Sequence, residues 1–402
     1  MKTNFYLPIL MVCVILIGPL AATADEWKLA AADNGFAFQL LREVSAAKPA
    51  QNVFISAYSA ATALQMVAGG AAGKTKAEMN TVLGTSGMST ETMGQANHEI
   101  AVSLNAGNTN VILTTANAVW YQRDFAVDTN FVIKTSEAFG ATFEPLDFKN
   151  PHSVDVINHW ASDQTHGRID HIADGLDPIY TRLFIANAVY FKGKWSDPFD
   201  ASETQNHPFH LRGGGEVQVP MMTKEATFAH RKGTGYEAVR LPYQDENLGM
   251  YVFLPDTYVS PEKLLGVFSG DRWRRVTKPG FKEERGVLLL PKFKFDYTVL
   301  LNDPLKKLGM ARAFDSERAD FGGIGKELYI STVLQKAFVE VKEEGTEAAA
   351  VTGITAVAAS AMPMPPPEEF HMTVDRPFVF LIEDNKTGVI LFMGVVYEPK
   401  GE

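Results

Sequence analysis

Up to residue 166, apolar side chains recur every three or four positions, the spacing of one face of a helix. Ser56 stands before one such segment as a helix N-cap, and Gly69-Gly70 follow it as a stop signal. The pattern predicts helices over Glu26–Ser45, Ala57–Val67, Lys76–Leu83, Glu91–Leu104, Asp128–Phe139 and Ser153–His166.

Strand patterns dominate the rest of the chain. Arg182–Phe191 is apolar on both faces, which is typical of a strand buried from both sides. Asp384–Gly388 is a tight turn that joins the last two strands into a hairpin. The predicted strands are Val111–Tyr121, Arg182–Phe191, Tyr236–Pro242, Leu248–Pro255, Gly286–Tyr297, Leu334–Val341, Pro377–Glu383 and Gly388–Tyr397. Helices early and strands late predict an α+β domain with large, mostly antiparallel sheets.

One long segment, Gly345–Arg376, fits neither pattern. It is small and polar at first and then rich in proline. A structureless loop of this length inside a compact domain is uncommon and usually functional. A disordered linker is the alternative, but the buried hairpin that follows tethers the segment at both ends. We therefore interpret it as a functional loop.

The first 24 residues have the pattern of a secretory signal peptide. Lys2 supplies a positive start, Leu7–Leu20 is an uncharged apolar run, and Ala22-Thr23-Ala24 is a small-residue cleavage site. The run is too short to span a bilayer stably, so a retained anchor is the weaker interpretation. We expect a secreted, extracellular protein, or a periplasmic one in a Gram-negative bacterium.

We expect the mature chain, residues 25–402, to be a single domain. Its composition excludes some classes of function. Cys13 is the only cysteine and leaves with the signal peptide, so the core alone must stabilise the exported protein. The net charge of −10 argues against nucleic acid or an anionic membrane as the main partner.

Motifs that could indicate enzymatic chemistry are weak. Gly69–Thr75 lacks the first glycine of a phosphate-binding loop and follows a predicted helix instead of a strand. The nine histidines do not have metal-ligand spacing, and no Gly-x-Ser-x-Gly motif is present. We expect neither an enzyme nor a cofactor or metal. One basic cluster, Arg272–Arg285, has the charge to bind a polyanion, but we interpret it as a solvated face.

The segment Lys336–Thr352 (KAFVEVKEEGTEAAAVT) closely resembles the hinge of the serpin family. Further blocks that are similar to serpins follow in the family's order across the mature chain. They are Asn52–Ser59 (NVFISAYS), Asn187–Phe199 (NAVYFKGKWSDPF), Leu241–Pro255 (LPYQDENLGMYVFLP), Leu290–Phe293 (LPKF), Leu305–Phe314 (LKKLGMARAF), Asp320-Phe321 and Arg376–Val395 (RPFVFLIEDNKTGVILFMGV).

The resemblance implies a serpin fold, with a five-stranded central sheet, two smaller sheets, eight or nine helices and an exposed reactive loop at about 345–376. It implies that a serine protease cuts the loop, which then inserts into the central sheet while the protease is still acylated to it. We expect the inhibitor to act as a monomer.

The resemblance also assigns residues. The hinge is Glu343, Glu344, Gly345, Thr346, Glu347, Ala348, Ala349 and Ala350. The central sheet opens at Ser56, Ser59, Asn187 and Gln335, and Trp195 lies near the point where the loop enters. Two positions depart from the family, which usually has proline at Ala57 and histidine at Gln335. An amide can still both donate and accept a hydrogen bond.

The hinge residues are physically suited to insertion. In a strand, Thr346, Ala348, Ala350 and Thr352 would share one face, and all four are small. The fourteen residues from Thr346 to Ala359 would form roughly 45 Å of strand. A hydrogen bond nets only about 1 kcal/mol, and ordering a residue costs about as much or more. The uncut protein must therefore store strain or poor packing that insertion relieves.

The spacing from Glu343 in the family places the cleaved bond at Ala359–Ser360, with Ala358–Ala359 and Ala361–Met362 as alternatives. Alanine would enter the primary pocket of the protease, and no arginine or lysine lies between Gly345 and Arg376. An elastase-like protease is the expected target, with subtilisin-like proteases second. A non-inhibitory serpin with a storage, carrier or chaperone function is the alternative. The resemblance argues against it, because ovalbumin-like members carry a large or charged residue in the hinge and this sequence does not.

Overall fold

The computed structural model describes residues 23–105, 111–245, 247–346 and 369–400. In these ranges the α-helices are α1 (Ala24–Ala47), α2 (Ala57–Gly69), α3 (Gly73–Leu83), α4 (Thr90–Asn105), α5 (Thr129–Phe139), α6 (Ser153–Gln164), α7 (Pro261–Val267), α8 (Gly270–Arg272) and α9 (Asn302–Leu308). The six helices predicted from the apolar spacing are all present. Ser56 caps α2 as predicted, because its side chain accepts a hydrogen bond from the Ser59 amide.

The strands form two sheets. They are β1 (Val53–Ile55), β2 (Val111–Gln122), β3 (Thr142–Leu146), β4 (Leu183–Lys194), β5 (Gln205–His210), β6 (Glu216–Gly233), β7 (Tyr236–Pro242), β8 (Leu248–Pro255), β9 (Lys282–Pro291), β10 (Phe293–Leu300), β11 (Ile330–Lys342), β12 (Gly345–Thr346), β13 (Phe370–Thr373), β14 (Phe378–Asp384) and β15 (Ile390–Val396). Residues 347–368, most of the expected reactive loop, lie outside the described ranges.

The central sheet has the strand order β10-β11-β12-β4-β2-β3. β4 and β11 are its middle strands and pair in parallel over eight residue pairs, from Ile330–Leu183 to Phe338–Tyr190. β4 is buried on both faces over its first nine residues, as its continuous apolar run predicted. The two-residue strand β12 lies between β4 and β11 beyond the end of their pairing.

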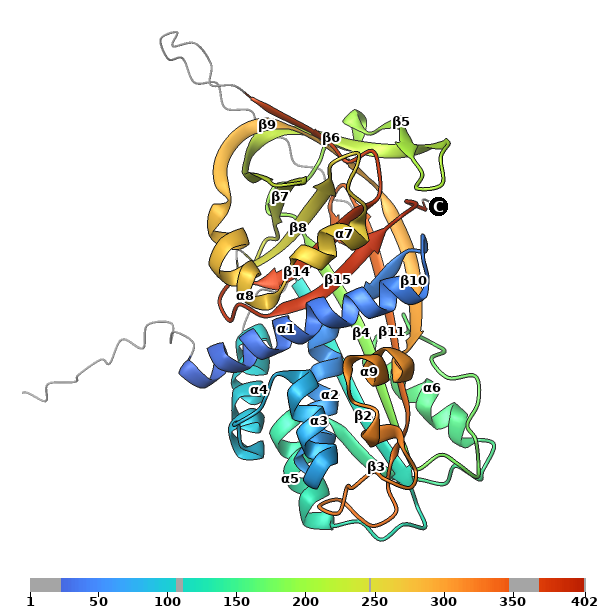
Figure 1. Cartoon of the computed structure of the whole chain (residues 1–402). Coiled ribbons are helices and arrows are strands. Elements are labelled where there is room, and N and C mark those ends of the chain that lie inside the picture. The colour runs from blue at the N-terminus through green and yellow to red at the C-terminus, as the bar shows by residue number, and fades with distance from the viewer. Residues whose placement is uncertain (1–22, 106–110, 246, 347–368, 401–402) are drawn as a thin grey trace, which may run out of the picture.

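The second sheet contains the strands that were expected as two smaller sheets. They are continuous in the order β1-β15-β14-β8-β7-β6-β9-β13, with β5 paired to β6. The long strand β6 joins the two parts, because one end pairs with β5 and the other with β7. The predicted hairpin of β14 and β15 is present. In Figure 1 this sheet fills one half of the molecule, and α2–α5 gather in the other.

Two buried clusters hold these layers together. The larger joins α1 and α2 to both sheets, and Phe54 stacks against Phe380 and Phe392 within it. A smaller cluster lies between α6 and the central sheet, where Ile157 and Ala161 pack near Phe184 and Ala186. The helix α6 therefore covers one face of the central sheet, over β2 and β4.

One predicted strand, Gly286–Tyr297, is wrong in its continuity. The structure has two strands, β9 and β10, because the chain changes sheets at Lys292. The Lys292 amide still donates to the Pro220 carbonyl at 2.9 Å, in the register of β6 with β9, and from Phe293 on the chain pairs with β11. Apolar content alone did not reveal this break.

Candidate functional site: the hinge and the opening of the central sheet

The first residues of the hinge already lie inside the central sheet. After β11 the chain turns at Glu343 and Glu344 and returns as β12. Gly345 and Thr346 pair antiparallel with Lys342 and Val341 on one side, and with Lys194 and Gly193 on the other. β12 is therefore a wedge between two strands that are paired with each other further along the sheet.

Glycine is the one residue type that fits at position 345. Its φ is +149°, a backbone conformation that residues with a side chain rarely adopt. A Cβ atom at this position would lie 2.1 Å from the Gly193 carbonyl oxygen. The predicted pivot is thus a place where the hinge touches the backbone of β4.

Glu343 anchors the turn. Its carboxylate lies 3.0 Å from the Lys292 ammonium and accepts a hydrogen bond from the Thr204 hydroxyl at 2.8 Å. Burial alone would raise the pKa of Glu343, but its backbone amide, Lys292 and Thr204 outweigh burial and hold the pKa below its usual range. The carboxylate is therefore charged at neutral pH and ties the hinge to the start of β10.

Trp195 lies beside the end of β11, next to the turn that leads into β12. Its indole N–H donates to the Lys342 carbonyl at 3.0 Å, and its ring stacks on Tyr243 at 4.6 Å. The Tyr243 hydroxyl is hydrogen-bonded to the Thr346 hydroxyl at 2.8 Å, and Thr346 is only 1% exposed. Tyr243, which sequence reasoning missed, thus joins Trp195 to the inserted end of the hinge.

The other predicted residues form a second polar cluster further along the sheet, between α2, β2, β4 and β11. Gln335 replaces the family's usual histidine and makes two hydrogen bonds of 2.9 Å with the amide and carbonyl of Ser56. The Ser56 hydroxyl donates to the Leu391 carbonyl at 2.8 Å. An amide at Gln335 therefore holds β11 to the start of α2.

Asn117 completes this cluster and was not predicted. Its side-chain oxygen accepts hydrogen bonds from the Ser59 hydroxyl and the Asn187 amide, both at 2.7 Å. Asn187 lies opposite both Asn117 and Gln335 in the sheet. The Asn187 side-chain oxygen is buried without a hydrogen-bond partner among the described residues. From Asn187 to Gly193 β4 rises by roughly 20 Å, so the cluster and the hinge are separate regions.

The remaining predicted residues lie outside the described ranges. These are the distal hinge residues Glu347, Ala348, Ala349 and Ala350, and the reactive bond between Ala359 and Ser360. Their assignment stays a prediction, as does the signal peptide, of which only Thr23 and Ala24 are described.

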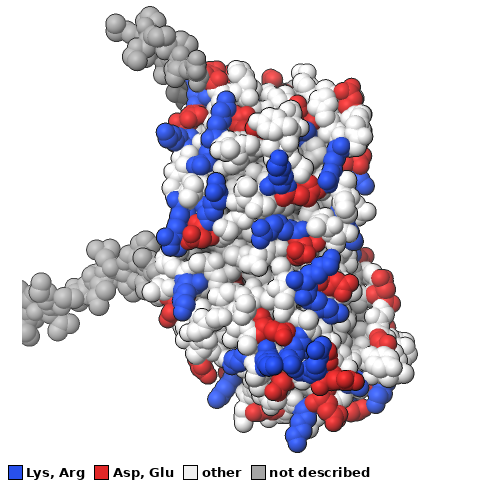
Figure 2. All heavy atoms as spheres, in the orientation of Figure 1, with Lys and Arg blue, Asp and Glu red and all other residues white. Residues whose placement is uncertain are grey.

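The basic segment Arg272–Arg285 is partly neutralised in the structure. Asp271 forms ion pairs with Arg274 and Arg275, and Glu225 forms one with Arg285. On the face in Figure 2, basic and acidic side chains are interspersed.

Within the described ranges, no three histidine, cysteine or carboxylate side chains are grouped so that they could hold a metal ion. No helix in these ranges has the length and apolar content needed to cross a membrane.

Comparisons with known proteins agree with this geometry. A relative from Thermococcus kodakarensis, described as an uncharacterized serpin-like protein, is 38% identical and covers 91% of this chain and 85% of its own. The human leukocyte elastase inhibitor is 33% identical over 92% of this chain and all of its own.

Solved structures have the same fold. The native state of the thermophilic serpin tengpin matches with a TM-score of 0.83 and 29% identity over 95% of this chain and 96% of its own. Human thyroxine-binding globulin with bound thyroxine matches with a TM-score of 0.82 and 26% identity over 94% of this chain and all of its own. The profile of the serpin family (serine protease inhibitor) matches residues 31–399. The chain therefore belongs to the serpin family.

Proposed function

We propose that this chain is a secreted inhibitor of a serine protease and acts as a substrate that is used once. The observation that carries the proposal is the wedge formed by β12. Gly345 and Thr346 lie between β4 and β11, and they run antiparallel to both. If the loop is cut beyond the hinge, the residues after Thr346 can continue in the same direction as a full strand.

Strand pairing supplies part of the driving force in this proposal. The eight parallel pairs between β4 and β11 would be replaced by antiparallel pairs on both sides of the new strand. Antiparallel pairing is the more stable of the two per residue, and twice as many ladders would form.

The proposed target is an elastase-like protease, or second a subtilisin-like one, cleaving at Ala359–Ser360. Alanine fits a small apolar primary pocket. The absence of arginine and lysine between Gly345 and Arg376 would leave the buried aspartate of a trypsin-like pocket unpaired. The human leukocyte elastase inhibitor, 33% identical to this chain, names a target of the same class.

A carrier function is the alternative, because thyroxine-binding globulin shares the fold. Loop insertion requires a small residue at this position, so the small, buried Thr346 between β4 and β11 favours the inhibitor.

Incubation with a panel of elastase-like, subtilisin-like and trypsin-like proteases distinguishes the two functions. An inhibitor of the proposed kind gives a near one-to-one complex with the elastase-like protease that survives boiling in detergent. Cleaved chain and fully active protease with every member of the panel would contradict the proposal. Mass spectrometry of the fragment released from the complex locates the cleaved bond.

A further inference from the structure

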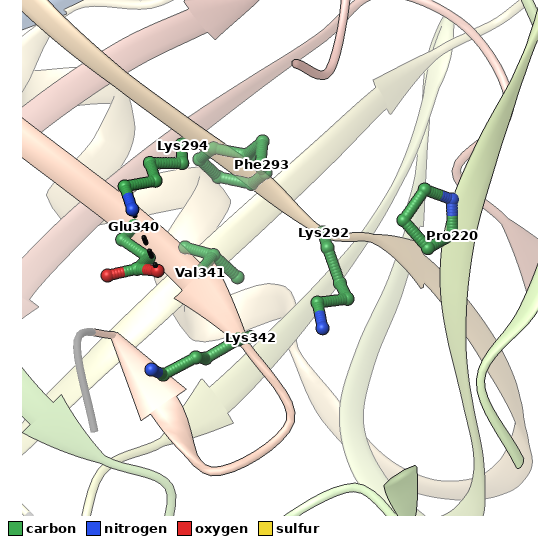
Figure 3. Close-up of a pocket in the computed structure, with 7 residues that line it drawn as sticks. All are labelled: Pro220, Lys292, Phe293, Lys294, Glu340, Val341 and Lys342. Atoms are coloured by element: carbon green, nitrogen blue, oxygen red, sulfur yellow. Dashed lines mark ion pairs between the residues drawn. The ribbon is translucent and has the colours of Figure 1, made fainter. Parts of the chain in front are cut away.

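The two ends of the expected reactive loop are anchored in different ways. At the N-terminal end, the chain leaves β11 beside a cavity of about 410 Å³ that is lined by charged side chains such as Lys294, Glu340 and Lys342 (Figure 3). Towards the C-terminal end, the chain enters β13, where Phe370 is only 6% exposed. A buried aromatic side chain therefore anchors the loop at this second end.

β13 needs such an anchor because its backbone pairing is short. It is an end strand of the second sheet and pairs with β9 alone, over four residues from Phe370–Gly286 to Thr373–Leu289. A short strand that is paired on one side only gains few hydrogen bonds. Its retention in the sheet therefore depends largely on the packing of its buried side chains.

The Phe370 ring packs on the ring of His230, a residue of β6. The two rings are parallel to within 1°, with centroids 3.9 Å apart, and Phe228 packs against the Phe370 ring at 5.8 Å. On the β9 side, a Cβ atom at Gly286 would lie 2.3 Å from the Phe370 ring. The next residue of β13, His371, is exposed and points to the opposite face. Phe370 is thus enclosed between the backbone of β9 and the plane of the His230 ring.

Two carboxylates fix the plane of the His230 ring. Its Nδ1 lies 2.7 Å from a Glu284 oxygen of β9, and its Nε2 lies 2.9 Å from a Glu237 oxygen of β7. His230 is 1% exposed, so water cannot replace either contact. A neutral imidazole has one N–H group and a carboxylate only accepts, so both hydrogen bonds form only when the ring is an imidazolium.

The charges around His230 favour the same state. Burial alone would lower the pKa of His230, but the hydrogen bonds to Glu237 and Glu284 outweigh burial and raise the pKa above its ordinary value of about 6.5. Two lysines are the other charged groups nearby. Lys232 lies 3.8 Å from the Glu237 carboxylate, and Lys282 stands opposite His230 in the register of β6 with β9.

We propose that His230 is a positioning residue of the inhibitor, and that its imidazolium holds Phe370 and thereby the C-terminal stem of the reactive loop. When the ring loses its proton, one carboxylate faces a nitrogen lone pair, the ring turns, and Phe370 loses the plane on which it packs. A less ordered stem costs more to fix when the protease binds, so complex formation slows. The effect on inhibition rests on the proposed function, whereas the charge of His230 does not.

Nitrogen-15 NMR of the intact protein with labelled histidine tests the charge without a protease. At pH about 7 a histidine of ordinary pKa is mostly neutral, whereas both ring nitrogens of His230 should still carry a proton. His230→Gln identifies the signals of this ring by their loss. A His230 ring that is neutral at this pH would overturn the proposal.

Glu284→Gln makes the cluster independent of pH. The glutamine amide can donate to Nδ1 of a neutral His230 while Nε2–H donates to Glu237, so both hydrogen bonds survive deprotonation of the ring. Rates of complex formation with an elastase-like protease are compared for variant and wild type at each pH, which cancels the pH dependence of the protease itself. The ratio of variant to wild type should be near one at pH about 6 and rise to about fivefold at pH about 9, the effect of one further side chain that must be ordered.

A matched control and two outcomes decide the coupling. His98→Gln removes an exposed histidine of α4 and should leave the wild-type pH profile unchanged. A ratio of Glu284→Gln to wild type that stays constant from pH about 6 to about 9 would refute the link between His230 and the loop. If no protease forms a complex, the inhibitory function fails, and the NMR measurement still decides the charge of His230.

Discussion

Thr346→Arg tests whether the hinge must enter the sheet. Thr346 is 1% exposed between β4 and β11, and its hydroxyl bonds to the buried Tyr243 hydroxyl at 2.8 Å. An arginine would place a cation where the threonine has only a hydroxyl partner. A buried charge without a partner costs about 3–5 kcal/mol. In the intact variant we expect residue 346 to leave the sheet and keep the cation in solvent, so the penalty returns when the cut loop inserts. If only a third of it acts in the transition state of insertion, insertion slows by about tenfold.

The assay is incubation of the variant with the elastase-like protease, followed by denaturing electrophoresis. Slower insertion gives the acyl-enzyme time to hydrolyse, so the ratio of covalent complex to cleaved chain should fall by about tenfold. Thr346→Ser keeps the hydroxyl and the small volume, and it should inhibit like the wild type. A Thr346→Arg variant that retains the wild-type ratio would refute the insertion mechanism.

Three further predictions concern the polar cluster, a buried carboxyl group and the reactive bond. Gln335→Leu leaves the amide and carbonyl of Ser56 unpaired, so it should lower the free energy of unfolding of the intact protein by about 2 kcal/mol and lower its thermal midpoint. Gln335→His should restore most of the lost stability. An unchanged midpoint for the leucine variant would contradict the role of this contact. Burial raises the pKa of Asp33 to about 7, so the folded state holds this proton more firmly than the unfolded state, and stability falls as pH rises from about 4 to about 7. Asp33→Asn should therefore stabilise the protein more at pH about 8 than at pH about 5, and an equal gain at both values in thermal melts would be evidence against this assignment. Ala359→Arg should convert the inhibitor from an elastase-like to a trypsin-like target, as judged by complex formation with each protease, and a variant that still prefers elastase would place the cleaved bond elsewhere.

Most helices and strands could be predicted because their apolar residues are either periodic or, as in β4 and β8, continuous. α5 begins at the residue after Asp128, which caps it, and β7 and β8 have the predicted bounds. The strand β6 was missed because polar and charged residues interrupt its pattern where it passes between the two parts of the second sheet. The alternation of a strand is a clear signal only where one face is uniformly buried.

The parts of the site that are contiguous in sequence could be predicted, whereas contacts between distant segments could not. Gly345 and Thr346 were identified because the hinge is contiguous in sequence. Tyr243 meets Thr346 across 103 residues, so local sequence gives no sign of this contact. Asn117 did leave a signal, because a polar residue in the middle of an apolar strand requires a buried partner. Its partner Asn187 lies directly opposite it in the sheet.

The most direct test of the account compares the thermal stability of the intact protein with that of the protein cut once between Thr355 and Met362. A nick in a loop ordinarily leaves a protein no more stable than before. If the intact form is strained and the freed hinge extends β12 into a full strand, the midpoint should rise by roughly tens of degrees, far beyond the few degrees that correspond to 1 kcal/mol. Equal melting of the cut and uncut proteins would show that the loop does not insert and would contradict the proposed mechanism.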